Sequence, residues 1–250
     1  MGEFYLRVVS HLRTWTALVF ERRLRKWRGT HPHISFTFDD FPHSAYEGGG
    51  GILRKYNLRG SYYASLGLMG KESPIGKMFS LDDLRQIVEE GHELGCHTYD
   101  HIDAWKGKAP IFEQSINRNR EALREILDRT HFKTISYPKS EPHPRNKLIA
   151  GNYFDCCRGG GQTFNCGVID LNLVKSCFID KVNNETEETL KLKIDQNRKK
   201  RGWLVFSTHD VRENPSRFGC TPELFERVVR YAVDSGAVIL PVCEVYSSCL

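Results

Sequence analysis

The sequence lacks the features that mark a membrane-spanning or secreted chain. It has no apolar run near the roughly 18 residues that a spanning helix needs, and its longest candidate, residues 16–20, is far too short. Its opening residues contain no basic start followed by an apolar core and a small-residue cleavage site. Leu6 stands where a myristoylation signal requires Ser or Thr. We therefore expect a cytoplasmic protein.

Two local motifs are also missing. No CxxC pair occurs among the eight cysteines, which argues against a structural zinc knot and, without a secretion signal, predicts reduced thiols. The glycine run at 48–51 lacks the Lys-Ser/Thr that follows in a phosphate-binding loop. We interpret that run as a flexible connection into a helix at 52–56.

The basic charge is concentrated at the N-terminus. Of the 36 basic and 31 acidic residues, seven and two lie within residues 1–30, which leaves 29 of each sign in the rest of the chain. A neutral body argues against a nucleic-acid-binding core. The sequence thus divides into a basic arm at 1–30 and a domain at 31–250.

Apolar residues of the arm recur at three- and four-residue steps, which predicts an amphipathic helix. They are Tyr5, Val8, Val9, Leu12, Trp15, Val19 and Trp27. The pattern leaves three interpretations open. The helix caps the domain, rests on an anionic membrane surface, or binds a protein partner.

From residue 33 onward, short apolar runs alternate with helix-like segments. The predicted strands are 34–38, 60–65, 92–98, 133–138, 153–157, 174–179, 203–208 and 237–242, and the clearest helices are 82–90, 112–128, 185–199 and 222–234. Such alternation predicts an α/β domain with a parallel sheet, closed into a barrel.

Polar residues at the carboxyl ends of parallel strands line the active sites of such folds. This rule selects Asp39, Asp40, His97, His101, Arg158, His209 and Asp210. Two adjacent aspartates repel each other unless a cation lies between or beside them. Histidines four residues apart present both rings on one side of a helical turn. Together they predict a catalytic site for one divalent metal, with zinc favoured and cobalt, nickel or iron as alternatives.

The remaining residues of this set supply acid–base chemistry. A carboxylate beside the metal can take a proton from an acidified water. An amine leaves only when it is protonated, and His209, at the end of a separate strand, can supply that proton.

The motifs TFDD (37–40) and GHELGCHTYDH (91–101) resemble the NodB-homology polysaccharide deacetylases, carbohydrate esterase family four. The similarity continues through ISYP, YFDCCRGG, WLVFSTHDV and TPELFERVVRYAVDSG, and covers roughly residues 34–246. The resemblance implies a distorted (β/α) barrel of seven or eight strands that hydrolyses N-acetyl groups on amino sugars.

By matching positions, the resemblance makes Asp39 the general base and His209 the general acid. It makes Asp40, His97 and His101 the metal ligands. The metal, with backbone N–H groups near 38–40 or at Tyr137, would stabilise the oxyanion.

The sequence departs from the family in its third motif, which commonly reads Arg-x-Pro-x-Gly. Here Ser136 and Ser140 stand at the Arg and Gly positions, around Pro138. Arg158 is a candidate to approach Asp39 instead, and the alternative is a surface or substrate-facing arginine. Tyr137 and Trp203 are candidates to stack on a sugar ring, although aromatic residues on strands usually belong to the core.

Two further residues border the histidines. We expect Cys96 to pack behind the site, because adjacent strand residues point to opposite faces. Asp100 either orients a histidine or faces solvent.

The favoured function is a metal-dependent hydrolase that deacetylates an amino sugar in an oligo- or polysaccharide, or in its lipid- or nucleotide-linked precursor. An alternative keeps the metal but changes the substrate to a cyclic ureide or formamide. A further alternative is a non-catalytic sugar-binding relative. The sequence indicates no protein partner and no nucleic acid, and it leaves the sugar open.

Overall fold

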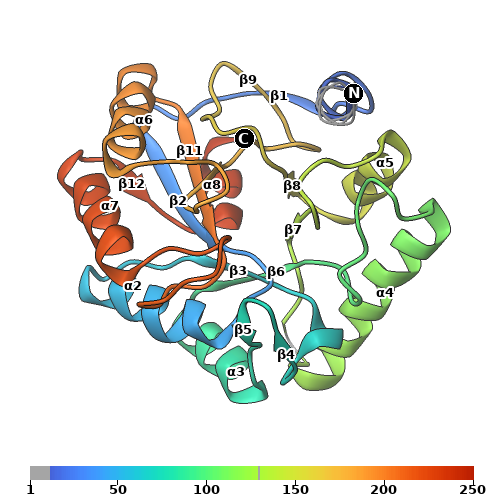
Figure 1. The fold of residues 1–250 in the computed structure, drawn as a ribbon. Helices are drawn as coiled ribbons and strands as arrows, with labels where there is room; N and C mark the ends of the chain where they lie inside the picture. Colours follow the sequence, from blue (N-terminus) through green and yellow to red (C-terminus); the bar gives the residue numbers. More distant parts are fainter. Residues whose placement is uncertain (1–11, 129) are drawn as a thin grey trace, which may run out of the picture.

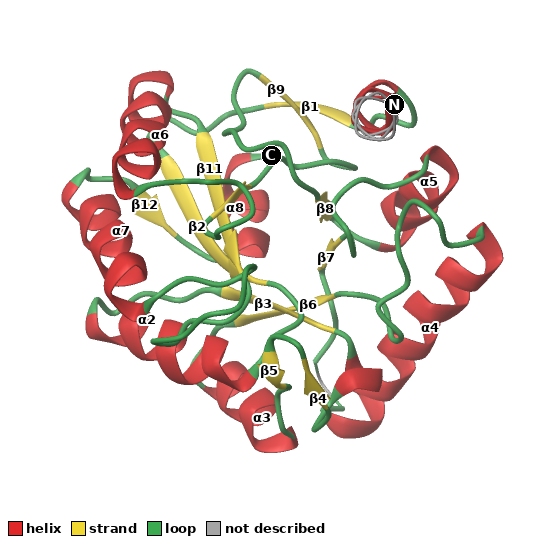
Figure 2. Ribbon diagram, in the orientation of Figure 1, coloured by secondary structure: helices red, strands yellow, loops and turns green. Residues whose placement is uncertain are grey.

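The computed structural model describes residues 12–128 and 130–250. A curved sheet of parallel strands surrounds the core, and most of the helices lie on its outer side (Figures 1 and 2). The strands follow the spatial order β10-β11-β2-β3-β6-β7-β8, and β12 pairs with the first two residues of β2. They are β2 (His33–Phe38), β3 (Ser61–Ala64), β6 (Glu93–Cys96), β7 (Thr134–Ser136), β8 (Cys156–Arg158), β10 (Cys177–Phe178), β11 (Trp203–Thr208) and β12 (Val238–Ile239).

The two edges of this sheet approach each other through the segment 171–174. The N–H of Cys157 donates to the carbonyl oxygen of Leu171 at 2.8 Å, and Arg158 forms a parallel bridge with Val174. This irregular closure makes the sheet a distorted barrel. The predicted α/β barrel is confirmed.

Helices connect the strands, and several begin at the caps that the sequence provides. The helices are η1 (Ala45–Gly50), α2 (Gly51–Lys55), η2 (Leu66–Leu68), α3 (Leu81–Glu89), α4 (Ala109–Ile126), α5 (Pro144–Tyr153), α6 (Glu187–Lys200), α7 (Pro222–Asp234) and α8 (Val242–Cys249). Ser80 and Asp83 form a capping box at α3, and Thr221 caps α7 just before Pro222. The pattern for 222–234 therefore predicted α7 with its correct bounds.

The glycine run at 48–51 is helical, so the expected flexible connection is wrong. These residues belong to the π-helix η1 and the start of α2. The reason is packing: a Cβ at Gly48 would collide with the carbonyl oxygen of Val211, and one at Gly49 with the ring of Phe38. Only glycine lets this helix approach the neighbouring segments so closely.

The N-terminal arm is not one continuous helix. A helix covers residues 12–19, and the chain then forms β1 (Leu24–Lys26), which pairs antiparallel with β9 (Val168–Asp170). Trp27, expected on the helix, lies beyond β1 and is buried, with its ring centre 6.0 Å from that of Trp203. Tyr5, Val8 and Val9 lie outside the described residues, and the boundary after residue 30 stays a prediction.

Trp27 and α8 complete an apolar layer at the amino-terminal end of the barrel. The layer joins Trp203 and Val205 of β11 to Val242 and Val245 of α8. The Trp27 indole N–H donates to the carbonyl oxygen of Arg201 at 2.7 Å, which satisfies its polar atom in this buried position. This end of the barrel is therefore covered by packed apolar side chains.

Two features bear on the expectations about cysteines and membranes. All eight cysteines are free, and six of them are buried. Among residues 12–128 and 130–250, no helix has both the length and the apolar character to cross a bilayer.

Candidate metal and catalytic site

Strand register gathers the predicted site at the carboxyl end of the barrel. β11 pairs with β2 over six residues, ending with Thr208 beside Phe38, so the next residues on each strand, His209 and Asp39, are neighbours. On the other side, β6 and β7 pair Cys96 with Ile135, and β7 and β8 pair Ser136 with Arg158. The strands therefore bring together residues that are up to 170 positions apart.

Asp40, His97 and His101 form one cluster. The Asp40 Oδ1 atom lies 3.4 Å from His97 Nε2 and 3.2 Å from His101 Nε2, and one ligand atom from each residue lies within 4.8 Å of the others. Two imidazoles and one carboxylate on separate segments are the ligand set of a catalytic divalent metal site. The structure thus brings the three expected ligands together.

The two histidines do not lie on a helical turn, so that part of the prediction is wrong. Residues 97–101 form a loop after β6, with left-handed backbone at Thr98 (φ 58°) and His101 (φ 53°). The Ser115 hydroxyl of α4 accepts from the N–H groups of Tyr99 and Asp100, at 3.0 and 3.1 Å. Packing on α4 therefore sets a backbone shape that these residue types seldom adopt alone.

His97 is held as a neutral imidazole with one nitrogen available. Its Nδ1 atom lies 2.8 Å from the carbonyl oxygen of Ser136, which can only accept, so Nδ1 carries the proton. Burial lowers the pKa of His97 to about 4, and the nearby Asp40 and Asp39 carboxylates oppose this shift only in part. The Nε2 lone pair therefore points toward Asp40 with no proton on it.

The surroundings of Asp40 test whether a metal fits. Its Oδ1 atom is buried and receives no hydrogen bond. That oxygen faces the Nε2 lone pair of His97, so two electron-rich atoms oppose each other at a buried position, which is costly. A divalent cation bound by Asp40, His97 and His101 would satisfy all of these atoms, and the donor set suits zinc and similar transition metals.

Asp39 lies in a separate cage of donors. Arg158 Nη2 donates to its Oδ1 atom, as does the Ser136 hydroxyl at 3.0 Å, and the Ser207 hydroxyl donates to Oδ2 at 3.2 Å. Burial alone would raise the pKa of Asp39, but the Arg158 guanidinium, with smaller contributions from His97 and His209, holds it well below its usual range. Asp39 is therefore a fully ionised carboxylate.

Arg158 takes the position next to Asp39 that the sequence analysis proposed for it. The guanidinium is buried, its Nη1 donates to the Ser176 hydroxyl at 3.1 Å, and it lies near the rings of Tyr63 and Phe178, at 5.1 and 5.7 Å. Its Nη2 also donates to the Ser136 hydroxyl. Ser136, at the position where the family has Arg, is small enough to leave room for a side chain that enters from the neighbouring strand.

His209 faces the cluster from β11. Its Nε2 atom lies 3.9 Å from Asp40 Oδ2, while Nδ1 lies 3.2 Å from the carbonyl oxygen of Phe218 and therefore carries the proton in the neutral ring. Asp210 supports this arrangement by accepting from the N–H and hydroxyl of Ser216, at 2.7 and 2.6 Å, in the loop that carries Phe218. In the neutral ring the Nε2 atom is therefore unprotonated, and it faces the Asp40 carboxylate.

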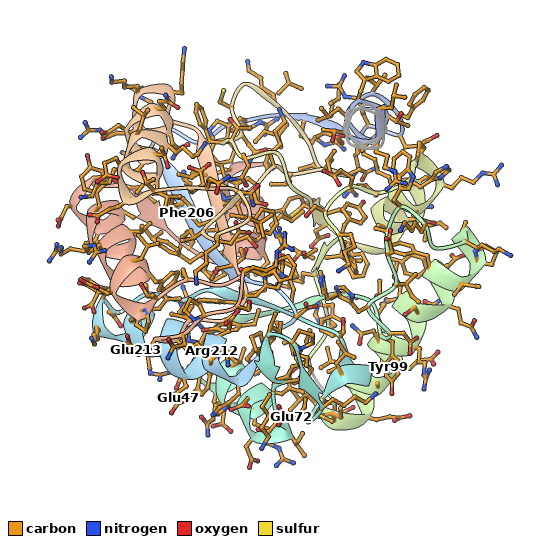
Figure 3. All side chains as sticks on the ribbon, in the orientation of Figure 1. Glu47, Glu72, Tyr99, Phe206, Arg212 and Glu213 are labelled. Carbon is orange, nitrogen blue, oxygen red and sulfur yellow. The ribbon has the colours of Figure 1, made fainter. Side chains whose placement is uncertain are left out.

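The loop after His209 also contacts η1. Arg212 donates to Asp210 at 3.0 Å, and Figure 3 shows Arg212 and Glu213 on the same side of the molecule as Glu47 of η1. The close approach of Gly48 to Val211 agrees with this placement. The loops after β2 and β11 therefore support each other beside the site.

Three of the proposed supporting residues do not contact the site as expected. Trp203 is fully buried at the amino-terminal end of β11, and its indole N–H donates to the Ser35 hydroxyl, so it belongs to the core. The Tyr137 ring is buried too, and its hydroxyl donates to the carbonyl oxygen of Asn172 at 3.0 Å. Pro138 accepts from the N–H of Ala104 at 3.1 Å, which ties β7 to the loop after His101. Neither aromatic ring can therefore stack on a sugar.

Two of the backbone N–H groups expected to stabilise the oxyanion already donate hydrogen bonds within the protein. The backbone N–H of Tyr137 donates to the carbonyl oxygen of Arg158 at 2.9 Å. The backbone N–H of Asp39 donates to the carbonyl oxygen of Thr208, also at 2.9 Å. These two N–H groups are therefore unavailable to a substrate.

Two other expectations can be placed. Cys96 packs behind the site, where its sulfur accepts from Asn119 at 3.3 Å. Asp100 contacts Ser115 at 3.2 Å and Arg118 at 3.5 Å, so it orients the loop and not a histidine ring.

The sequence analysis did not identify the hydroxyl groups of Ser136 and Ser207 as hydrogen-bond donors to Asp39. Ser207 could have been found from the sequence, because side chains two residues apart on a strand lie on the same face, which places Ser207 on the same side as His209.

The fold and site define an α/β barrel with a two-histidine, one-carboxylate cluster at the carboxyl ends of its strands. The profile of the family described as polysaccharide deacetylase matches residues 27–152, about half of the chain. The chain belongs to this family. The matched segment contains Asp39, Asp40, His97 and His101, whereas Arg158 and His209 lie beyond it.

Solved structures with similar folds include two deacylating enzymes. A family 4 acetyl xylan esterase from Clostridium thermocellum, in complex with a cobalt ion, is 19% identical, with a TM-score of 0.61 over 86% of this chain and 90% of that chain. The chitin deacetylase of Colletotrichum lindemuthianum is 18% identical, with a TM-score of 0.62 over 87% of this chain and 89% of that one. At such identities the likeness establishes the fold alone.

A curated relative is much longer. A gellan lyase from Bacillus sp is 23% identical over an alignment 230 residues long, which covers 85% of this chain but only 9% of that protein. The similarity therefore concerns a small part of the lyase.

Proposed function

We propose that this protein is a metal-dependent hydrolase that removes the N-acetyl group from an amino sugar, in an oligo- or polysaccharide or in its lipid- or nucleotide-linked precursor. Membership of the polysaccharide deacetylase family supports this class of reaction. The observation that carries the proposal is the unpartnered Oδ1 atom of Asp40, which faces two imidazole nitrogens beside an ionised Asp39.

Asp40, His97 and His101 would hold the metal. A bound divalent ion, with zinc favoured, supplies Lewis acidity that polarises an acetyl carbonyl and acidifies a water molecule. The fixed tautomer of His97, set by Ser136, keeps one ring nitrogen available for this purpose.

Asp39 would act as the base. Its Oδ1 atom is occupied by Arg158 and Ser136, which leaves Oδ2, with one hydroxyl donor, to take the proton of the attacking water. Because Arg158 keeps Asp39 ionised, the carboxylate is ready to accept a proton at any ordinary pH. It is an intrinsically weak base, so it can take a proton only from a water molecule that is already acidified.

His209 would act as the acid. Its Nδ1–H is held by the carbonyl oxygen of Phe218, so a second proton on Nε2 gives an imidazolium that can donate to the departing amine nitrogen. This step matters because an unprotonated amine is a poor leaving group.

The cytoplasmic location expected from the sequence stays a prediction.

The test combines metal content with acetate release. The purified chain, Asp39→Asn and His97→Ala are analysed for bound metal, titrated with zinc, and assayed on N-acetylated chitooligosaccharides, peptidoglycan fragments and O-acetylated xylooligosaccharides. We expect one metal per chain, lost in His97→Ala and kept in Asp39→Asn, with acetate release abolished in both. His31→Ala and Asp82→Asn, at exposed positions, serve as matched controls and should retain full activity.

The outcomes separate the alternatives. Acetate from the xylan substrates alone would replace the amide by an ester. Metal binding without acetate from any sugar would favour a small cyclic ureide or formamide as substrate. Sugar binding that is unaffected by Asp39→Asn, with no turnover, would identify a non-catalytic relative. Absence of metal binding would refute the proposed site.

A further inference from the structure

The N-terminal helix, residues 12–19, packs on the domain through one side. Arg13 lies over the ring of Trp105 at 5.4 Å, Thr14 donates to Glu141 at 3.5 Å, and Ala17 is buried. At 100° per residue these three positions fall within about one third of the helix circumference. The helix is therefore attached along a narrow strip beside α5, at the outer edge of the barrel (Figure 1).

A buried lysine fixes the carboxyl end of this helix. Lys147 of α5 donates to the carbonyl oxygens of Ala17 and Phe20, at 2.6 and 2.8 Å, and pairs with Asp170 of β9 at 2.7 Å. An ammonium group at a helix carboxyl end satisfies its free carbonyls and the negative end of its dipole. The orientation of the helix is thus set by the domain.

The opposite side of the helix is apolar and open to solvent. Leu12, Trp15 and Val19 follow one another at three- and four-residue steps, on the side away from Ala17. The Trp15 side chain is 57% exposed and makes an edge contact with Phe20, also exposed. Such a row of large side chains would normally be covered in a soluble domain.

The strand ribbon beside the helix continues this surface. Leu18 lines a hollow together with Arg22, Val168 and Lys175. We call the whole surface the apolar ridge. It consists of Leu12, Trp15, Leu18, Val19, Phe20, Leu24 and Val168, which are seven of the twelve large apolar side chains exposed among the described residues. More than half of these side chains therefore gather at one edge of the molecule.

Basic side chains accompany the ridge. Lys26 pairs with Val168 in the β1–β9 register, and Arg22, Arg25 and Arg28 are also exposed. Between residues 12 and 28 the only acidic residue is Glu21, while the chain beyond residue 30 has equal numbers of acidic and basic residues. The positive charge of the protein therefore accumulates where its apolar surface is exposed.

We infer that the apolar ridge and its basic rim bind the interface of an anionic lipid bilayer. Aromatic and aliphatic side chains enter the headgroup boundary, while arginine and lysine contact lipid phosphates. Charge complementarity decides against a second copy of this chain, because a symmetric dimer through the ridge would oppose the two basic rims. Since the helix is already fixed, binding needs no folding of these residues.

The attachment of the helix places the catalytic end near the bilayer. Arg13 contacts Trp105 and Thr14 contacts Glu141, and these partners lie in the loops that follow His101 and Pro138. The bilayer would thus lie along the side of the barrel, with the site opening next to it. Surface binding itself does not depend on the proposed deacetylation, so the two can fail separately.

Vesicle sedimentation of the full chain tests the inference. Vesicles of phosphatidylcholine are compared with equal mixtures of phosphatidylcholine and phosphatidylglycerol, at low salt and at 0.5 M salt. We expect binding to the anionic vesicles, at least tenfold weaker in high salt and on neutral vesicles. Brominated lipids should quench the fluorescence of Trp15, measured as the difference between the intact chain and Trp15→Ser.

Point variants identify the surface involved. Trp15→Ser with Val19→Ser, and separately Arg22→Gln with Lys26→Gln, should each weaken binding about tenfold or more. Leu192→Ser and Lys199→Gln on α6, one exposed apolar and one exposed basic residue, are the matched controls and should leave binding unchanged. Circular dichroism melting confirms that every variant is folded.

Three results would overturn the inference. They are no binding of the intact chain to anionic vesicles, an equal loss in the α6 controls, and binding that survives both the Trp15/Val19 and the Arg22/Lys26 double substitutions. Light scattering provides an independent check. A concentration-dependent dimer that the ridge variants abolish, without lipid binding, would show that a second copy covers the ridge and would refute the lipid proposal.

Discussion

The Arg158 guanidinium contacts the Asp39 carboxylate from β8, the strand directly beside β7, which ends at Ser136, the third-motif position where the family usually carries its arginine. β8 and β7 pair Arg158 with Ser136, so the longer side chain passes over the serine and bonds to both Ser136 and Asp39. Its other nitrogen is held by Ser176. The departure in the third motif is therefore compensated locally by a serine and an arginine in register.

We predict that Arg158→Lys lowers kcat about hundredfold with little change in KM, because lysine keeps the charge but cannot bond to Asp39, Ser136 and Ser176 together. Zinc affinity should stay within about threefold, since no metal ligand is touched. Steady-state kinetics and calorimetric titration of zinc measure the two quantities. A change in KM alone would instead place Arg158 in substrate binding.

His209→Gln should distinguish an acid from a structural histidine. We expect kcat on an N-acetylated sugar to fall about a thousandfold. Hydrolysis of 4-nitrophenyl acetate, whose leaving group needs no proton, should fall less than tenfold. Equal losses on both substrates would contradict the acid role.

The glycine run supplies a test of packing. Gly48→Ala should lower the free energy of unfolding by about 2 kcal/mol, because the new Cβ would collide with the backbone of Val211. Gly51→Ala, at the start of α2, meets no atom closer than 3.7 Å and should be neutral or stabilising by up to about 1 kcal/mol. Urea denaturation measures both. If Gly48→Ala and Gly51→Ala lowered the free energy of unfolding by similar amounts, the requirement for glycine at position 48 would not come from the space beside Val211.

Lys147 should be important for stability. Lys147→Met leaves two carbonyl oxygens without a donor and Asp170 without its cation, at a cost of about 3 kcal/mol in the free energy of unfolding. Lys191→Met removes a half-exposed pair with Glu187 and should cost less than about 0.5 kcal/mol. Urea denaturation of both variants provides the comparison. A loss in Lys147→Met no larger than in Lys191→Met would mean that water replaces the ammonium group.

The sequence predicted the barrel well because its strands alternate clearly with amphipathic helices. β11 and α7 have the expected bounds. In contrast, α5 was not foreseen, since Lys147 on it is buried and Leu148 is exposed, which inverts the usual pattern. Strand β1 was hidden for another reason: it is extended only because β9, over 140 residues away, pairs with it.

The sequence predicted which residues form the site, but not how the backbone brings them together. Strand ends selected Asp40, His97 and His101, but the histidines meet through a loop with left-handed backbone, which spacing alone could not reveal. Trp203 failed as a sugar platform because it is the first residue of β11, at the opposite end of the strand from His209. Its burial follows from Trp27, which stacks on it from outside the strand.

The stacking of Trp27 on Trp203 has a practical consequence for how the catalytic unit can be isolated. A fragment that starts at residue 31, the boundary suggested by charge, would uncover the tryptophan of β11 and open the apolar layer beneath the barrel. It would also remove β1, leaving the N–H and carbonyl groups of β9 without partners. We therefore expect the smallest self-sufficient unit to begin before Leu24, and we expect a truncation that removes the basic arm to expose the apolar layer at the amino-terminal end of the barrel.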